Sequence, residues 1–465
     1  MMKRIILILA AVLLGTASLA AQNVAPFKDG DRVVFLGDSL TDGGHYHSFI
    51  WLWYLTRYPD MDIRVFNAGI GGDTVKDMYE RLDGEVFPKR PTVVLVTFGM
   101  NDTGYFEYNH PGAEEYGQRR LAECAEKYTM LEERLKTVDG MRIILLGGSP
   151  YDEFSTFKGE GMAAEPFKGK NEVLRKVSDM MRKSAEANGW EFMDFNDPMV
   201  AAQAKILEKN PEWTYTMLDR IHPDNDGHML MAYLFLESQG FKGSKVAETR
   251  IDARKESVLV QDNCEISSLS TERNVISFDY LAHALPYPLD TIPRGWQSMR
   301  SQAQVLDIVP FMEDMNQEIL AVEGLKGEWS LEIDGVELGT WNADQWKKGI
   351  NLAELTFAPQ YQQAMEVMHL NEYRWDIERE FRDYSWIQYN FFQEKGLLEV
   401  NDMHSAQLLD KEKAGNVWLM GHRGKWERLR LKNVREARLR EIEMLSQTMN
   451  QINNPQTRRV VLKRK

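Results

Sequence analysis

The chain has 465 residues, and its 70 acidic side chains outnumber its 56 lysines and arginines to give a formal net charge of −14. Because residues 421–465 hold 13 Lys or Arg and only 4 Asp or Glu, the rest of the chain is strongly acidic. This distribution excludes a nucleic-acid-binding body and a body that docks on anionic membranes. The 43% apolar content is typical of a globular protein, and two cysteines exclude a disulfide-dense scaffold or a cysteine-based zinc cluster.

Residues 1–21 have the pattern of a secretory signal peptide. Lys3 and Arg4 form a basic start, and the apolar run at 5–14 is too short to cross a bilayer as a helix. Small residues precede the expected cleavage point. An uncleaved anchor is the alternative. We therefore expect a secreted protein, periplasmic or extracellular, whose mature chain has no transmembrane segment.

Short apolar strands alternate with longer helical patterns through the first half of the chain. This alternation is typical of a parallel sheet that is covered by helices on both faces. The sequence thus predicts an α/β fold with a ligand crevice beyond the carboxyl ends of the strands. The expected strands are 32–36, 63–66, 92–98, 142–146 and 191–195, and the expected helices lie near 46–57, 73–83, 112–138, 171–188, 198–208 and 226–239.

Three of these strands end in a polar motif, and a fourth motif lies near the end of the region. Ser39 stands in a tight Gly-Asp-Ser-Leu turn that can expose its hydroxyl near free backbone N–H groups. Gly72 lies in a glycine-rich turn where the backbone can approach a ligand, and Asn101 brings an amide that can donate to an oxyanion. Asp219 precedes His222 by three residues, a spacing suited to orienting an imidazole toward a nucleophile. Each motif alone is also compatible with an ordinary turn or cap.

Together and in this order, the four motifs resemble those of the SGNH hydrolases, also called GDSL-type lipases and acylhydrolases. The resemblance implies a flavodoxin-like, three-layer α/β/α sandwich and a carboxylic ester hydrolase that needs no cofactor and no metal. It implies that Ser39 is the nucleophile, that His222 is the general base and then the general acid, and that Asp219 orients His222. It also implies an oxyanion hole made by the backbone N–H groups of Ser39 and Gly72 and by the side-chain amide of Asn101.

Other residues near the strand ends are candidates for substrate contact. Asp38 and His45 flank the Ser39 turn, and Tyr105 and Tyr151 lie in aromatic loops that can stack on a sugar ring or contact an acyl chain. Ordinary loop packing is the alternative. His45 and His47 also suggest a metal pair, but because the sequence shows no third ligand cluster we expect no metal.

The second half has a different pattern. The Asp334-Gly335 pair between alternating segments predicts a hairpin, and Asn342 can cap a short helix that ends near Gly349. Longer helical patterns follow, and these helices either complete the hydrolase or form a separate unit. Whether Cys124 and Cys264 pair is open. The expected division is a signal peptide at 1–21, a hydrolase at 27–243, a β-rich accessory region at 244–355, and a helical region at 356–465 with a basic tail, its helices at 359–392 and 429–451.

Secretion narrows the expected chemistry. It disfavours an acyl-CoA thioesterase, since CoA esters are cytosolic, and no extended apolar lid supports long-chain lipids. We expect a secreted serine esterase that removes O-acyl groups, above all O-acetyl, from carbohydrate. A lipase or arylesterase acting on short-chain esters is an alternative, and so is a non-catalytic carbohydrate-binding or scaffold protein. The expected partner is an acylated small molecule or glycan, and the acidic body disfavours polyanions.

Overall fold

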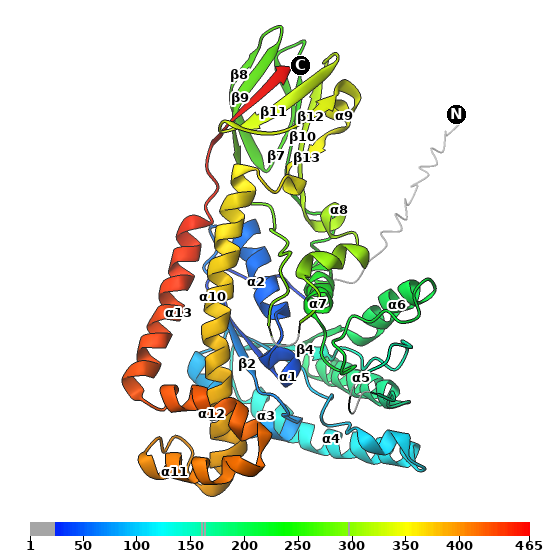
Figure 1. The fold of residues 1–465 in the computed structure, drawn as a ribbon, viewed down its shortest axis with the longest axis vertical. Coiled ribbons are helices and arrows are strands. Elements are labelled where there is room, and N and C mark those ends of the chain that lie inside the picture. The colour runs from blue at the N-terminus through cyan, green and yellow to red at the C-terminus, as the bar shows by residue number, and fades with distance from the viewer. Residues whose placement is uncertain (1–23, 160, 162–163, 296–297) are drawn as a thin grey trace, which may run out of the picture.

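The computed structural model describes residues 24–159, 161, 164–295 and 298–465 (Figure 1). The expected signal peptide at 1–21 lies outside the described residues. In the part of the chain that the structure describes, no helix is both long and apolar enough to cross a membrane. A five-stranded parallel sheet of order β2-β1-β3-β4-β5 forms the centre of the first half. Its strands are β1 (Arg32–Gly37), β2 (Arg64–Gly69), β3 (Val93–Val96), β4 (Arg142–Gly147) and β5 (Glu191–Asp194).

Helices cover both faces of this sheet, so the predicted three-layer α/β/α fold is confirmed. Because successive side chains of a strand point to opposite faces, Val33 and Phe35 enter one core while Val34 and Leu36 enter another. The first core is closed by α2 and α7, and the second by α3, α4 and α5. The helices are α1 (Ser39–Asp42), α2 (Tyr46–Arg57), α3 (Val75–Glu80), α4 (Ala113–Lys136), α5 (Lys170–Asn188), α6 (Asn196–Leu207) and α7 (Asn225–Ser238).

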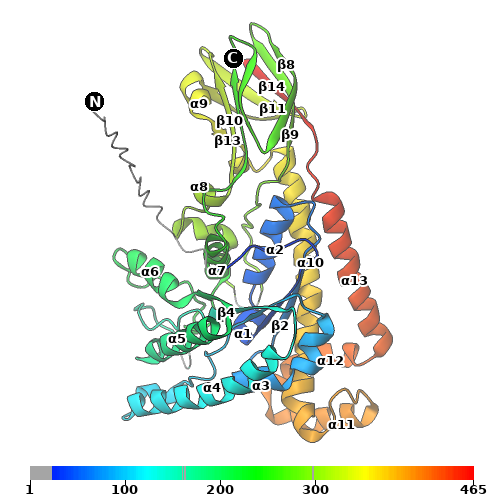
Figure 2. The same cartoon turned by 180° about the vertical axis from the view of Figure 1, so that it is seen from behind.

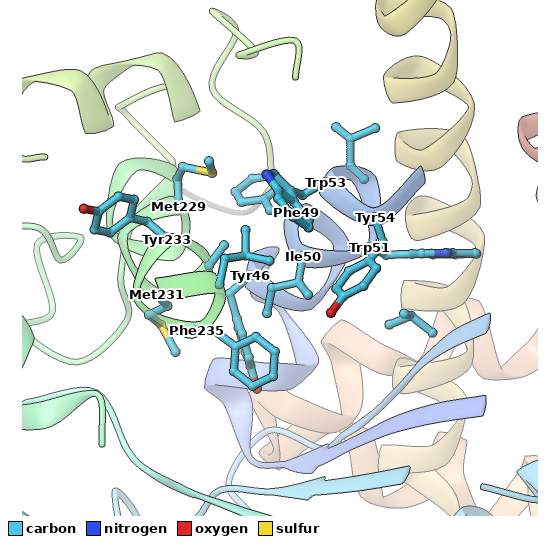
Figure 3. Packing of buried hydrophobic residues seen from close by; sticks show 14 of the residues in the cluster. Tyr46, Phe49, Ile50, Trp51, Trp53, Tyr54, Met229, Met231, Tyr233 and Phe235 are labelled. Carbon is cyan, nitrogen blue, oxygen red and sulfur yellow. The ribbon is translucent and has the colours of Figure 1, made fainter. Parts of the chain in front are cut away.

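Helix α2 is buried along its whole length. Its large side chains interleave with those of α7, as Figure 3 shows for Tyr46 and Phe49 of α2 and for Met229 and Phe235 of α7. A helix that is apolar on every side belongs in a core, because no face of it gains from contact with water. The sheet, α7 and a helix from the second half of the chain surround α2.

The second half begins with two sheets that share one apolar core. Their strand orders are β13-β10-β6-β7 and β12-β11-β14-β9-β8. The predicted short helix forms as α9, where the side chain of Asn342 accepts from two backbone N–H groups at its start. The elements are β6 (Lys245–Asp252), β7 (Ser257–Asp262), β8 (Cys264–Thr271), β9 (Val275–Ala282), α8 (Phe311–Met315), β10 (Gln317–Glu323), β11 (Glu328–Ile333), β12 (Val336–Asn342), α9 (Ala343–Lys348), β13 (Ile350–Asn351) and β14 (Arg458–Arg464).

The end of the chain differs from the helical region that we expected over 356–465. Strand β14 returns to the sandwich and lies between β11 and β9. Val460 and Leu462 point to one face of this strand and are fully buried in the sandwich core, whereas Val461 points to the other face and is only partly buried. The sequence does not indicate this strand, because its three apolar residues are consecutive and basic residues flank them.

The helices between the sandwich and β14 pack on the hydrolase. Helix α10 runs from the sandwich along the side of the parallel sheet, with α13 beside it (Figures 1 and 2). Its residues Val367 and Met368 belong to the same core as α2, and Asn371 donates to the backbone oxygen of Ser48 on α2. Cys124 and Cys264 are buried, unpaired and in separate cores. The helices are α10 (Pro359–Ile387), α11 (Met403–Glu412), α12 (Val417–Leu429) and α13 (Lys432–Ile452).

Candidate active site

Ser39 lies where β1 turns sharply into α1. Gly37 ends the strand, and a side chain there would lie 2.2 Å from the hydroxyl oxygen of Thr41, so the turn requires glycine. Asp38 caps α1, because its carboxylate accepts from the backbone N–H of Leu40 at 3.0 Å. Ser39 is therefore the first residue of a helical turn at the carboxyl end of a central strand, and it is partly exposed.

His222 connects Ser39 to Asp219. The Nε2 atom of His222 is 2.8 Å from Ser39 Oγ, and its Nδ1 atom is 2.5 Å from Asp219 Oδ2. The other oxygen of Asp219 accepts from the backbone N–H groups of Ile221 and His222, each at 2.9 Å. This arrangement fixes the carboxylate and leaves the imidazole with its Nε2 atom toward the serine.

The charge around His222 favours its protonated form. Burial lowers the pKa of His222, but the hydrogen bond and negative charge of Asp219, with the charges of Asp38 and Asp42, outweigh burial and raise it above the usual 6.5. Burial raises the pKa of Asp219, but its hydrogen bonds and the charge of His222 lower it further than burial raises it. The pair is therefore suited to holding a proton that His222 takes from a nucleophile.

Gly72 and Asn101 follow β2 and β3. Gly72 is exposed and has a φ of 89°, a left-handed conformation that favours glycine. The amide nitrogen of Asn101 donates to the backbone oxygen of Asp73 at 2.9 Å, which places it beside the Gly72 turn. The hydroxyl of Tyr105 donates to the amide oxygen of Asn101 at 2.8 Å and so sets which way the amide points.

Two basic residues that we did not predict hold the loop after β3. The Nζ atom of the buried Lys170 donates to the backbone oxygen of Met100 and to the hydroxyl of Thr103, each at 2.8 Å, and lies 4.1 Å from the centre of the Tyr105 ring. Burial lowers the pKa of Lys170 to about 7. Arg120 donates to the backbone oxygens of Asn101 and Asp102. Nothing in the sequence near Asn101 signals either residue.

Three of the four residues that we predicted as substrate contacts are buried in the structure. Tyr151 has no exposed surface, and its hydroxyl accepts from the backbone N–H of Phe167. His45 is 2% exposed, and the centre of its ring lies 3.8 Å from that of Trp375. Asp38 is buried, and its carboxylate caps α1. The fourth, Tyr105, is partly exposed and contacts Asn101.

Helix α10 also reaches the site, which the sequence does not indicate. Its Arg379 forms an ion pair of 2.8 Å with Asp42 at the end of α1. Its Trp386 donates from the indole nitrogen to the backbone oxygen of Gly71 at 3.0 Å. These residues lie more than 300 positions beyond the turns that they contact, so only the tertiary fold brings them there.

Beside Trp386 lies an aromatic face from α12. The His422 ring stacks on Trp386 at 4.6 Å, and the Trp418 ring lies 6.5 Å from it and is 64% exposed. A cavity of about 480 Å³ opens next to Arg379 between α10, α12 and α13. It is lined by Tyr373, Asp376, Ile377, Arg379, Glu380, Lys425, Arg438, Glu441 and Leu445.

Two known families match separate parts of the chain. The GDSL-like lipase/acylhydrolase family matches residues 35–230, the part that carries the sheet and the Ser39 and His222 motifs. The diltiazem deacetylase C-terminal helical domain matches residues 365–454. The chain belongs to the GDSL-like lipase/acylhydrolase family, as its four motifs predicted, and it is a carboxylic ester hydrolase.

Among solved structures, the chain is similar to a gut microbial diltiazem-metabolizing enzyme. The two are 52% identical with a TM-score of 0.93, over 96% of this chain and 100% of that one. An acetylxylan esterase of Geobacillus stearothermophilus is 26% identical over 236 residues, which are 46% of this chain and 95% of that protein. A solved structure of that esterase has 25% identity and a TM-score of 0.36, over 46% of this chain and 96% of that one.

Proposed function

We propose that the protein hydrolyses acetyl esters through an acyl-enzyme formed on Ser39. The observation that carries this proposal is the continuous contact from Ser39 Oγ to His222 and on to Asp219, at 2.8 and 2.5 Å. Removal of an acetyl group is also common to the names of two matches, a diltiazem deacetylase domain and an acetylxylan esterase.

The geometry suits a two-step reaction. His222 Nε2 takes the proton of Ser39 as Oγ attacks the ester carbonyl, and the new oxyanion receives hydrogen bonds from the N–H groups of Ser39, Gly72 and Asn101. His222 then passes the proton to the leaving alcohol, and the acetyl group stays on Ser39. In the second step His222 takes a proton from water as the water oxygen attacks the acyl carbonyl. The bond to Ser39 Oγ then breaks, His222 returns the proton to Oγ, and acetate leaves.

The packing next to Ser39 supports a small acyl group. Leu40, Met100 and Ile221 belong to one apolar cluster and are each less than a tenth exposed. Lengthening the acyl chain against such a packed cluster forces side chains out of their preferred rotamers, which typically costs about 1–3 kcal/mol. We therefore expect acetyl esters to be hydrolysed faster than butyryl or longer esters.

The alcohol part of the ester is the less constrained side. Our first candidate is a small acetylated molecule with an apolar ring system, since Trp418 offers an exposed aromatic face beside the Gly71 turn and the 52% identical relative is a diltiazem-metabolizing enzyme. The second candidate is an acetylated carbohydrate. It is favoured by the cavity beside Arg379, where the charged side chains of the lining can bind hydroxyl groups.

Turnover of 4-nitrophenyl acetate by the purified protein and its variants tests the reaction. Ser39→Ala and His222→Ala should each lower kcat by several orders of magnitude, because each removes a participant in bond making. Undiminished turnover in either variant rejects the proposal. A panel of acetylated drugs, acetylated xylo-oligosaccharides and fatty-acyl esters then separates the substrates, and release from the fatty-acyl esters alone rejects both candidates.

We also propose that residues 1–21 direct secretion and are removed. The support is the basic start and short apolar run described above. N-terminal sequencing of the protein recovered from its native cell tests this: a mature protein that starts at Met1 contradicts it.

A further inference from the structure

We propose that α10 supports the oxyanion hole: its residues Trp386 and Arg379 orient the peptide whose N–H, that of Gly72, is one of the oxyanion donors. The inference rests on the proposed function, because an oxyanion hole has meaning only if the chain hydrolyses esters. It gives the C-terminal helices a role in catalysis that is separate from their packing on the sheet.

The first step concerns one peptide plane. The backbone oxygen of Gly71 and the N–H of Gly72 belong to the same peptide unit, and in a trans peptide they point in opposite directions. Trp386 donates to that oxygen at 3.0 Å. A donor that fixes the oxygen on one side therefore aims the N–H on the other. It also polarises the peptide, which strengthens Gly72 as a donor.

The second step concerns the preceding peptide. The N–H of Gly71 donates to Asp42 Oδ2 at 2.9 Å, and the other oxygen of Asp42 pairs with Arg379 at 2.8 Å. Asp42 is only 4% exposed, so its ionised form needs a nearby positive charge. Burial raises the pKa of Asp42, and Arg379 is the largest of the charges that oppose this rise. Arg379 thus keeps an acceptor in place for Gly71.

Further contacts from the same face of α10 hold the base of the loop. Glu378 accepts from the backbone N–H of Asn67 at 2.7 Å, and the side chain of Asn67 in turn accepts from Gly69 N–H at 2.8 Å. Positions 378, 382 and 386 are spaced four apart and so lie along one side of the helix. The end of β2 and the turn after it are therefore held against α10 at Asn67 and Gly71.

Two substitutions test the proposal in the full-length enzyme. Trp386→Phe keeps an aromatic ring against His422 but removes the indole N–H. Arg379→Gln removes the positive charge that pairs with Asp42. Each should lower kcat on 4-nitrophenyl acetate by about 3- to 30-fold, less than direct loss of an oxyanion donor, and leave KM within about two-fold. Arg379→Lys should recover part of the loss, because it restores a positive charge.

Matched controls separate orientation from folding. Trp346→Phe removes an equivalent bond, from an indole N–H to the backbone oxygen of Trp329 in the distant sandwich, and should leave kcat unchanged. Arg423→Gln breaks ion pairs with Asp410 and Glu427 and should also leave kcat unchanged. Melting temperatures show whether each variant is folded.

The outcomes are distinguishable. A wild-type kcat in folded Trp386→Phe and Arg379→Gln overturns the inference, and so does an equal fall of kcat in the two controls. If Trp386→Phe does not fold, the comparison of Arg379→Gln with Arg379→Lys decides alone, and equal activity in those two overturns the inference. An inactive wild-type enzyme instead rejects the proposed function.

Discussion

His222 is the residue at which the site responds most directly to pH. In the proposed reaction the neutral form of His222 is the base, so activity should rise as pH increases through its pKa. Because Asp219, Asp38 and Asp42 raise that pKa above 6.5 against the effect of burial, the rise should be centred above 6.5. The hydrogen bonds that Asp219 accepts from the backbone N–H groups of Ile221 and His222 hold its negative charge beside the ring.

Asp219→Asn tests this account of His222. The substitution removes the largest of the interactions that raise the pKa, so the rising limb of the pH profile of kcat/KM should move to lower pH. The plateau should also fall, by about 10²–10⁴-fold, because an amide does not stabilise the imidazolium and permits the wrong tautomer. The measurement is a pH profile of kcat/KM for the wild type and for Asp219→Asn. If the rising limb has the same midpoint in both, Asp219 does not raise the pKa of His222 as described.

At the scale of elements, α10 and α12 lie along one side of the site at the carboxyl edge of the sheet. Trp386 joins the Gly71 turn to α12 by stacking with His422, and Trp418 extends this aromatic face into solvent. An exposed tryptophan beside a reacting centre offers a large rigid surface to a ring of the substrate. We therefore place the alcohol part of the ester against α12.

Trp418→Ala tests that placement. For an acetyl ester of a fused aromatic alcohol, KM should rise by about 5- to 30-fold, the effect of losing roughly 1–2 kcal/mol of ring contact. For ethyl acetate, which is too small to reach α12, kcat/KM should be unchanged. If wild type and Trp418→Ala have equal KM values for the aromatic ester, the alcohol part of the bound substrate does not lie against α12.

Features that depend on neighbouring residues in the sequence could be predicted, whereas features that depend on contacts between distant residues could not. The strands and helices of the first half, the cap at Asn342 and the turn at Ser39 follow from local patterns, so they could be predicted. The burial of His45 could not, since it depends on Trp375 of α10, which stacks on it from 330 positions away. The role of Lys170 could not be predicted for the same reason: it is the first residue of α5, whereas the groups that accept its hydrogen bonds follow β3.

At the scale of the whole molecule, the basic end of the chain is part of the fold. Arg459, Lys463 and Lys465 on or next to β14 pair with Asp279, Glu332 and Glu337 of other strands in the same sheet. The excess of positive charge at the C-terminus is thereby matched to part of the acidic body. The chain leaves the sandwich into α10 and returns to it as β14, so a strand that follows the helices in sequence completes the sandwich.

Leu462→Ala tests the role of β14. Leu462 is fully buried in the sandwich core, so its truncation should lower the free energy of unfolding by about 2–5 kcal/mol. Val461→Ala, on the other face of the same strand and partly exposed, should cost much less. Thermal unfolding measures both, and kcat of the folded variants should match the wild type. Equal destabilisation by the two substitutions contradicts the assignment of the buried face.

The most direct test of the account is identification of the residue that carries the acyl group. The wild-type enzyme is mixed with excess 4-nitrophenyl acetate, quenched in acid within the first turnovers and digested for mass spectrometry. We expect the mass of one acetyl group on the peptide that contains Ser39, and no acetyl adduct in Ser39→Ala. Acetate release that continues in Ser39→Ala, or an acetyl group found on a different residue of the active wild type, would contradict the central claim.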